Sequence, residues 1–156
     1  PTYYIRDERP LAFIGTSPTG DDRSGFADYS FDGLDRPIFT ITAEGDVTAP
    51  DTLLPRVRPH YHMPATGDKY QMYINSDVTD HGTMNISPDN TMVHQALLAT
   101  TAVAFLDAKV LGVSGAQAYL ESSIVPELLL LDPDLRTEPP SALDLDGAPI
   151  PLWSVR

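Results

Sequence analysis

The sequence predicts an α/β protein with a mostly parallel sheet and helices packed on its faces. Three short runs predict strands, at residues 11–15, 38–42 and 69–75. The first two runs are continuously apolar or β-branched rather than alternating, which is typical of parallel strands covered on both faces. Residues 88–111 then carry apolar side chains at helical spacing. We therefore expect parallel strands joined by right-handed crossovers, with the 88–111 helix packed against the sheet.

Turn residues and prolines predict the loops that connect the strands. Ser17 and Pro18 end the first run, and a polar loop rich in Gly and Asp follows it. The second run, Ile38 to Thr42, is β-branched and aromatic. Four prolines interrupt residues 47–68, so no long helix is expected there, only a turn or two over 51–57. The third strand, 69–75, follows directly.

The second half reads as helices followed by a tail. Ser87 and Pro88 form a helix start signal, and Gly112 is expected to cap that helix at its end. A second helix is expected from 114 to about 124, with Pro126 breaking or kinking it. We predict one folded unit over residues 1–131. The proline-rich acidic tail, 132–156, has residues 143–145 and 150–153 placed to form a small hairpin.

Composition excludes several classes of function. The 156-residue chain has 22 acidic and 10 basic residues, for a net charge of −12. That balance argues against nucleic acid and anionic membrane surfaces as partners. Cysteine is absent, so neither a disulfide framework nor a thiolate nucleophile is available. Because no apolar run approaches the length of a membrane span, we expect a soluble protein; the compartment is left open, secretion included.

An acid and a histidine follow two successive predicted strands. Asp46 comes shortly after the 38–42 run, and His81 comes after the 69–75 run. Carboxyl ends of parallel strands meet at one edge of a sheet, so both residues are expected at that edge. This is the order of the last two members of a Ser…Asp…His triad. The chain has no Ser on a G-x-S-x-G turn; Ser17 lies on a Ser-Pro turn with no predicted helix behind it.

His81 and Asp46 are the predicted catalytic residues. His81 would act as general base and then general acid, because an imidazole titrates near neutral pH. Asp46 would fix its tautomer and stabilise the imidazolium. Glu44 is a rival acid, but Gly45 favours a tight turn at Asp46. The alternative interpretations are an exposed loop histidine and an aspartate that caps a turn.

Other candidates are weaker. Asp77 and Asp80 precede His81 too closely to orient its ring, and both are expected in turns. His60 and His62 would share a face of an extended segment, which would suit a metal site. They could equally lie in a solvated loop or line a substrate cleft. We predict no cofactor and no metal.

Four segments in this order resemble the carboxyl-terminal half of an α/β-hydrolase. The resemblance is to esterases like dienelactone hydrolase, acetylhydrolase and polyester hydrolases. It covers roughly residues 9–122. The matching segments are 13–18 (a sixth strand ending in Ser-Pro), 36–46 (a seventh strand and its acid loop), 67–82 (an eighth strand and its His loop), and 104–112 with 116–120 (the final helices). The resemblance implies that Asp46 and His81 are the acid and base of a serine hydrolase, and that carboxylic esters are the substrates.

The nucleophile is the missing member of that resemblance. A partial parallel sheet with an open apolar edge invites aggregation, so we expect a second polypeptide or further residues to complete it. The expected partners are a complementary polypeptide carrying the nucleophile Ser and a small-molecule ester. The alternative is a non-enzymatic acidic subunit of a larger assembly, in which Asp46 and His81 would not converge.

Overall fold

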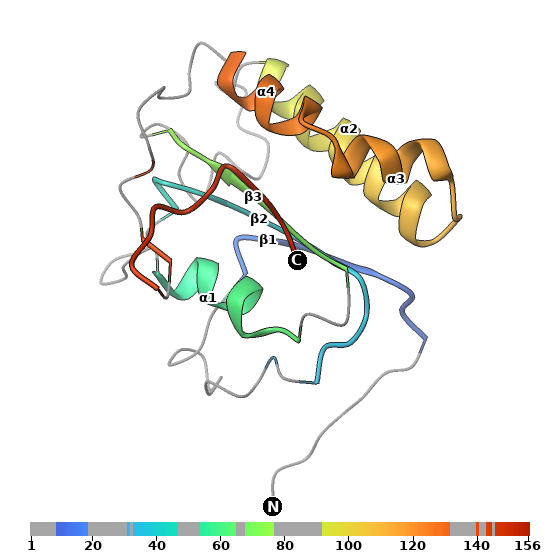
Figure 1. The fold of residues 1–156 in the computed structure, drawn as a ribbon, viewed down its shortest axis with the longest axis horizontal. Coiled ribbons are helices and arrows are strands. Elements are labelled where there is room, and N and C mark those ends of the chain that lie inside the picture. Colours follow the sequence, from blue (N-terminus) through green and yellow to red (C-terminus); the bar gives the residue numbers. More distant parts are fainter. Residues whose placement is uncertain are drawn as a thin grey trace, which may run out of the picture.

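The structure is a computed structural model that describes residues 9–18, 31, 33–46, 54–64, 68–76, 92–131, 140, 143–144 and 146–156. The described elements are four strands and four helices, with three consecutive helices between β3 and β4 (Figure 1). They are β1 (Phe13–Thr16), β2 (Ile38–Ala43), α1 (Leu54–His62), β3 (Lys69–Ile74), α2 (Met92–Lys109), α3 (Ser114–Glu121), α4 (Ile124–Leu131) and β4 (Trp153–Val155). The α/β class predicted from the sequence is confirmed.

The four described strands form one mixed sheet in the order β1-β2-β3-β4. The pairs β1–β2 and β2–β3 are parallel, as predicted, while β4 pairs antiparallel with β3. Helix α1 lies on one face of the sheet, and α2, α3 and α4 lie on the other (Figure 1). Because β1, β2 and β3 are parallel, their carboxyl ends lie at one edge of the sheet.

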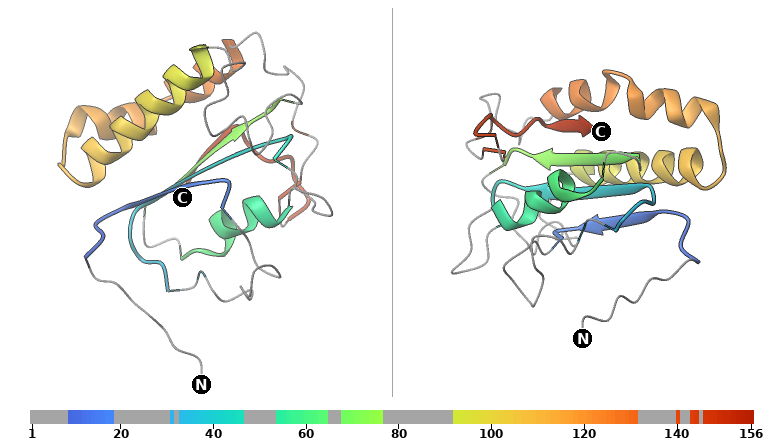
Figure 2. Two further views of the ribbon diagram at one scale, coloured as in Figure 1. Left: turned by 180° about the vertical axis from the view of Figure 1, so that it is seen from behind. Right: turned by 60° about the horizontal axis from the view of Figure 1, so that its bottom comes forward.

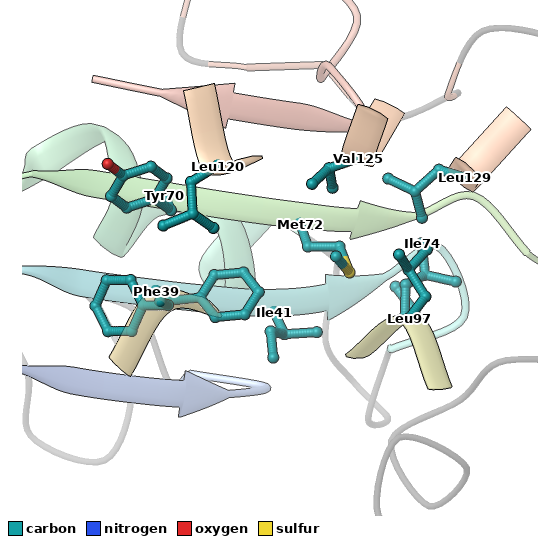
Figure 3. Packing of buried hydrophobic residues seen from close by; sticks show 11 residues of the cluster. Phe39, Ile41, Tyr70, Met72, Ile74, Leu97, Leu120, Val125 and Leu129 are labelled. Carbon is teal, nitrogen blue, oxygen red and sulfur yellow. The ribbon is translucent and has the colours of Figure 1, made fainter. Parts of the chain in front are cut away.

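The face under α2–α4 holds the apolar core. Alternate residues of β2 and β3 project into it and pack against side chains of the three helices (Figure 3). The sheet side of this cluster is Phe39, Ile41, Ala43, Tyr70, Met72 and Ile74; the helices add Leu97, Phe105, Leu120, Val125 and Leu129. Phe105 is central to it, with its ring centroid 5.8 Å from Phe39 and 5.7 Å from Tyr70. All residues of β2 and β3 are buried, which explains why their sequences do not alternate.

The face toward α1 is buried but polar. The residues of β2 and β3 that alternate with the apolar set include Thr40, Thr42, Lys69 and Gln71, each at most 2% exposed. Lys69 shows how such a group is satisfied: its Nζ donates to the backbone oxygens of His60, at 3.1 Å, and Met63. Burial, and to a smaller extent Arg156, lowers the pKa of Lys69. The two faces of the sheet therefore differ in chemistry: the face under α2–α4 is apolar, and the face toward α1 carries buried polar side chains.

Residues 47–68 contain more helix than the turn or two expected over 51–57, and no long helix is present in the described part of this segment. Helix α1 has nine residues and contains Pro59 in its interior. A proline there removes one backbone hydrogen bond. Tertiary packing outweighs that loss, because Val57 on α1 is fully buried against Tyr73 and Ile150.

The second half follows the predicted helices with shifted boundaries. Gly112 has a positive φ of 71°, as expected of a residue that ends a helix. The break expected at Pro126 comes earlier: α3 ends at Glu121, and Pro126 lies in the first turn of α4, where proline is tolerated. The predicted start signal at Ser87 and Pro88 lies outside the described residues.

The end of the chain belongs to the sheet. The hairpin expected between 143–145 and 150–153 is not present in that form: among the described residues Leu143 bridges Pro149, outside the expected range. The Trp153–Val155 strand instead pairs with β3, and the Trp153 indole N–H donates to the carbonyl oxygen of Leu120 at 3.1 Å. Residues 153–155 thus cover the edge of β3 and contact α3.

Candidate functional site

Asp46 lies at the carboxyl edge of the sheet, in the turn that follows β2. Its backbone N–H donates to the carbonyl oxygen of Ala43 at 3.0 Å, which closes the turn. The residue is 0% exposed. A buried carboxylate is costly unless hydrogen bonds or charges compensate it, so the groups around it define the site.

Three side chains from three elements surround the Asp46 carboxylate. The Ser17 hydroxyl donates to Oδ1 at 2.9 Å, and the Thr42 hydroxyl donates to Oδ2 at 2.9 Å. Arg56 on α1 forms an ion pair, with Nε 3.8 Å from Oδ1. The carboxylate is therefore held in one orientation by groups from β2, from α1 and from the end of β1.

Ser17 donates its hydroxyl hydrogen bond directly to the Asp46 carboxylate. It has φ 49°, which is unusual for a residue other than glycine, and its N–H donates to the Ile41 carbonyl oxygen at 2.8 Å. In a Ser…His…Asp arrangement the imidazole lies between serine and acid. Here the serine hydroxyl bonds to the acid itself, so the geometry makes Ser17 a partner of Asp46.

Arg56 and Thr42 are the residues of this site that the sequence analysis did not identify. Arg56 is 8% exposed, and its Nη1 donates to the carbonyl oxygens of Ser17 at 3.1 Å and Pro18 at 3.5 Å. It thereby ties α1 to the end of β1 as well as to Asp46. In the sequence, Arg56 stands out only as a charged residue between two prolines. Its contact with Ser17, 39 residues earlier, cannot be predicted from local sequence patterns.

Glu44, the rival acid, has a different partner. Its Oε2 accepts a hydrogen bond from the Tyr73 hydroxyl, between β2 and β3. Glu44 is half-buried, whereas Asp46 is fully buried. The two acids of this loop therefore have different partners: Glu44 accepts from the Tyr73 hydroxyl, whereas Asp46 accepts from the Ser17 and Thr42 hydroxyls and pairs with Arg56.

His81 lies outside the described residues, as do Asp77, Asp80 and Ser87. The chain that leads to His81 leaves β3 through Asn75 and Ser76, which are each 1% exposed. The Ser76 N–H donates to the Ile74 carbonyl oxygen at 3.0 Å. Asn75 and Ser76 therefore lie at the same edge of the sheet as Asp46, because the parallel strands β2 and β3 end there.

His60 and His62 do not share an extended face as we expected. Both lie on α1, where residues two apart point in widely different directions. His60 is 0% exposed, while His62 is half-buried. Within the described ranges, no group of three or more His, Cys, Asp or Glu side chains is placed to hold a metal ion.

His60 forms a serine–histidine pair of its own. Its Nε2 lies 3.1 Å from the Ser154 hydroxyl, and its Nδ1 has no hydrogen-bond partner among the described residues. Burial, then the charges of Lys69 and Arg156, lower the pKa of His60 to about 3. A general base at neutral pH needs a pKa much closer to 7. We therefore assign this pair to the packing of α1 against β4.

Comparison with known proteins finds no match to this chain among family models, characterised proteins or solved structures. In the described part of the chain, none of the helices has the length and apolar character that a membrane crossing requires.

Proposed function

We propose that this chain is the acid–base half of a serine hydrolase with an α/β-hydrolase fold. Asp46 is its acid and His81 its base, and a serine on another segment or polypeptide is the nucleophile. The observation that carries the proposal is the Asp46 carboxylate, fully buried at the carboxyl edge of the sheet and oriented by Ser17, Thr42 and Arg56. An acid that orients a catalytic imidazole needs this fixed position.

A carboxylate can accept several hydrogen bonds, an imidazole N–H among them. Asp46 already accepts from the hydroxyls of Ser17 and Thr42 and pairs with Arg56. In the proposed site, the His81 ring N–H is a further donor to this carboxylate.

Chain length allows His81 to reach Asp46. His81 comes five residues after Ser76. Five residues span up to roughly 17 Å when extended. Neighbouring strands lie about 4.8 Å apart, so the ends of β2 and β3 are well within that reach. This reach supports the pairing of the two residues.

In the proposed reaction, His81 removes the proton from the nucleophile serine as its oxygen attacks the ester carbonyl. The imidazolium then gives that proton to the departing alcohol, and the acyl group is held on the serine. His81 next takes a proton from a water molecule as its oxygen attacks the acyl carbon, and gives that proton to the serine oxygen as the acyl–serine bond breaks and the acid leaves. Asp46 remains ionised throughout and stabilises the imidazolium.

Carboxylic esters are the substrates we propose, by the family resemblance. The net charge of −12 argues against polyanionic substrates such as nucleic acid. Acyl and alcohol specificity depends on side chains around the nucleophile, which this chain does not supply.

The alternative function is that of an acidic interaction subunit. The ion pair and the two hydroxyl bonds around Asp46 are also what a purely structural buried aspartate needs. In that case His81 has no catalytic role, and the chain acts by binding other subunits.

A fluorophosphonate serine probe tests the proposal. The purified chain should not be labelled, because the one described serine at the site, Ser17, donates its hydroxyl to Asp46. With the complementary polypeptide present, labelling should appear on that polypeptide. His81→Ala should then reduce ester turnover by several orders of magnitude, and Asp46→Asn by up to about 10⁴-fold. Labelling of Ser17 in the chain alone, or turnover within about tenfold of wild type for His81→Ala, would contradict it.

A further inference from the structure

Gln71 is a buried amide in the middle of β3. The residue is 0% exposed. Neither Nε2 nor Oε1 of its side chain has a hydrogen-bond partner in the part of the chain that the structure describes. A buried polar atom without a partner lowers stability, and an amide has donors at one end and an acceptor at the other. Both ends of this side chain therefore need a partner.

The imidazole of His60 lies close to this amide. Gln71 is directly opposite Ser154 in the register of β3 and β4. Side chains so placed lie on one face of the sheet, with Cβ atoms about 4.5–5.5 Å apart. The Ser154 hydroxyl is in turn 3.1 Å from Nε2 of His60. His60 is also 0% exposed, and its Nδ1 is without a hydrogen-bond partner among the described residues. Ser154 thus adjoins both the Gln71 amide and the His60 ring.

These polar groups lie where α1 packs on the sheet. Gln71 stands between Tyr70 and Met72 along β3, and those two side chains belong to the apolar core under α2–α4. Successive side chains of a strand point to opposite faces, so the Gln71 amide is on the other face. Figure 2 shows α1 on that face, across the sheet from α2–α4. The amide atoms of Gln71 and Nδ1 of His60 are therefore buried between the same two elements.

We infer that Gln71 and His60 bind an internal water molecule that bridges β3 and α1. The occupant has to donate to Oε1 of Gln71 and accept from its Nε2, and water does both. Nδ1 of His60 is a donor or an acceptor according to the tautomer of the ring, and water suits either. A buried water makes about three hydrogen bonds to groups that would otherwise be unpaired, and these two side chains offer three such atoms.

Ions fit this position less well than water. Burial, then the charges of Lys69 and Arg156, lower the pKa of His60, and the same charges oppose a cation beside its ring. An anion accepts hydrogen bonds but donates none, so it would leave Oε1 of Gln71 unpaired. A neutral molecule that both donates and accepts is therefore favoured.

The bridge adds to the contacts that hold α1 on the sheet. Val57 packs against Tyr73 and Ile150, and His60 contacts Ser154. The water extends this set to the centre of β3. The inference concerns the packing of α1 and does not depend on the proposed function.

NMR of the intact chain tests whether water is bound. The side-chain amide of Gln71 is assigned from the signal that Gln71→Met removes. We expect a nuclear Overhauser effect between this amide and water, with the sign of a water that stays bound for longer than the protein takes to tumble. The Ser154 hydroxyl also exchanges protons with water, so the measurement is repeated with Ser154→Ala, in which the effect should persist.

Urea unfolding tests what the water contributes. Gln71→Met keeps the length of the side chain and removes both polar atoms. Because the variant loses hydrogen bonds to the water, we expect the equilibrium constant of unfolding to rise at least about fivefold. Without an occupant, the same change removes a buried unpaired amide, and stability should be unchanged or higher.

A double-mutant cycle links the two side chains to one water. Gln71→Met and His60→Leu should be non-additive, because each loses the same bridge. Thr40→Val is the matched control. Thr40 lies opposite Gln71 on β2 and is 1% exposed, but its hydroxyl donates to the Tyr70 carbonyl oxygen at 3.3 Å. Its effect should add to that of His60→Leu.

Three results would overturn the inference. The first is a Gln71 amide without the Overhauser effect to water, or with one that Ser154→Ala abolishes. The second is a Gln71→Met variant at least as stable as wild type. The third is additivity of Gln71→Met with His60→Leu, which would show that the two side chains share no occupant.

Discussion

Ser17 shows how one residue links backbone conformation to the site. Its positive φ of 49° is the only such value for a residue other than glycine in the described ranges. That conformation costs about 1–2 kcal/mol for an L-residue. The hydroxyl bond to buried Asp46 compensates for this cost, since a hydrogen bond to a charged group contributes about 1.5–3 kcal/mol.

Substitutions at Ser17 separate the cost of the positive φ from the contribution of the hydroxyl hydrogen bond. Ser17→Ala loses the hydroxyl but keeps the strained backbone, so we expect it to lower the free energy of unfolding by about 1.5–3 kcal/mol. Ser17→Gly loses the same bond but adopts the positive φ without strain. It should be more stable than Ser17→Ala by about 1 kcal/mol. Urea unfolding measures both variants, and equal stability of the two would show that the backbone term is absent.

His60 makes the stability of the protein depend on pH. Its pKa is about 3 in the folded protein, against 6.5 for an ordinary histidine. Below pH 6.5 the unfolded chain binds a proton that the folded chain does not. This contribution therefore falls as the pH drops from about 6.5 toward 3, and it is constant above that range. Between pH 7.5 and 5.5 the loss should be about 1.4 kcal/mol, before most carboxyl groups titrate.

Two histidine variants test this expectation. His60→Gln removes the titration, so its free energy of unfolding should fall less than that of wild type between pH 7.5 and 5.5, by about 1.4 kcal/mol. His62→Gln on the same helix leaves His60 in place and should retain that contribution. Urea unfolding at each pH measures the free energy of unfolding. If it changes equally with pH in wild type and His60→Gln, His60 is not a buried neutral imidazole.

In the turn between α2 and α3, the backbone conformation of one residue determines the direction of a whole helix. After α2, the Val110 N–H still donates to Leu106 at 2.8 Å, and the Val113 N–H donates to Asp107 at 3.0 Å. Gly112, with φ 71°, allows the chain to reverse there. The start of α3 follows two residues later, so the direction of α3 depends on this glycine.

Two glycine substitutions test the turn against the helix. A Cβ at Gly112 or at Gly115 would meet no atom within 4 Å, so only backbone conformation separates the two sites. Gly112→Ala should lower the free energy of unfolding by about 1 kcal/mol because of its positive φ. Gly115→Ala, inside α3, should raise it by about 0.4–1 kcal/mol. Thermal unfolding compares the variants, and a stabilising Gly112→Ala would contradict the assigned turn.

At the scale of the whole molecule, the sequence predicts the layers better than the contacts between them. Strands β1–β3 and their parallel order follow from local apolar runs. Helix α1 extends beyond the turn or two expected over 51–57, because Val57 and His60 pack against distant strands and this packing outweighs its prolines. The pairing of β4 with β3 was missed for the same reason. Asp46 was identified from its place after a strand, whereas Arg56 reaches it through the fold.

The pairing of Asp46 with His81 is tested most directly by NMR of the His81 side chain in the intact protein. The resonance is assigned with His81→Gln and compared between wild type and Asp46→Asn. We expect an imidazole N–H proton that exchanges slowly and is shifted downfield by a hydrogen bond to the carboxylate, and we expect Asp46→Asn to abolish that signal. An imidazole with the exchange and chemical shift of a free histidine, unchanged by Asp46→Asn, would contradict the proposed acid–base pair.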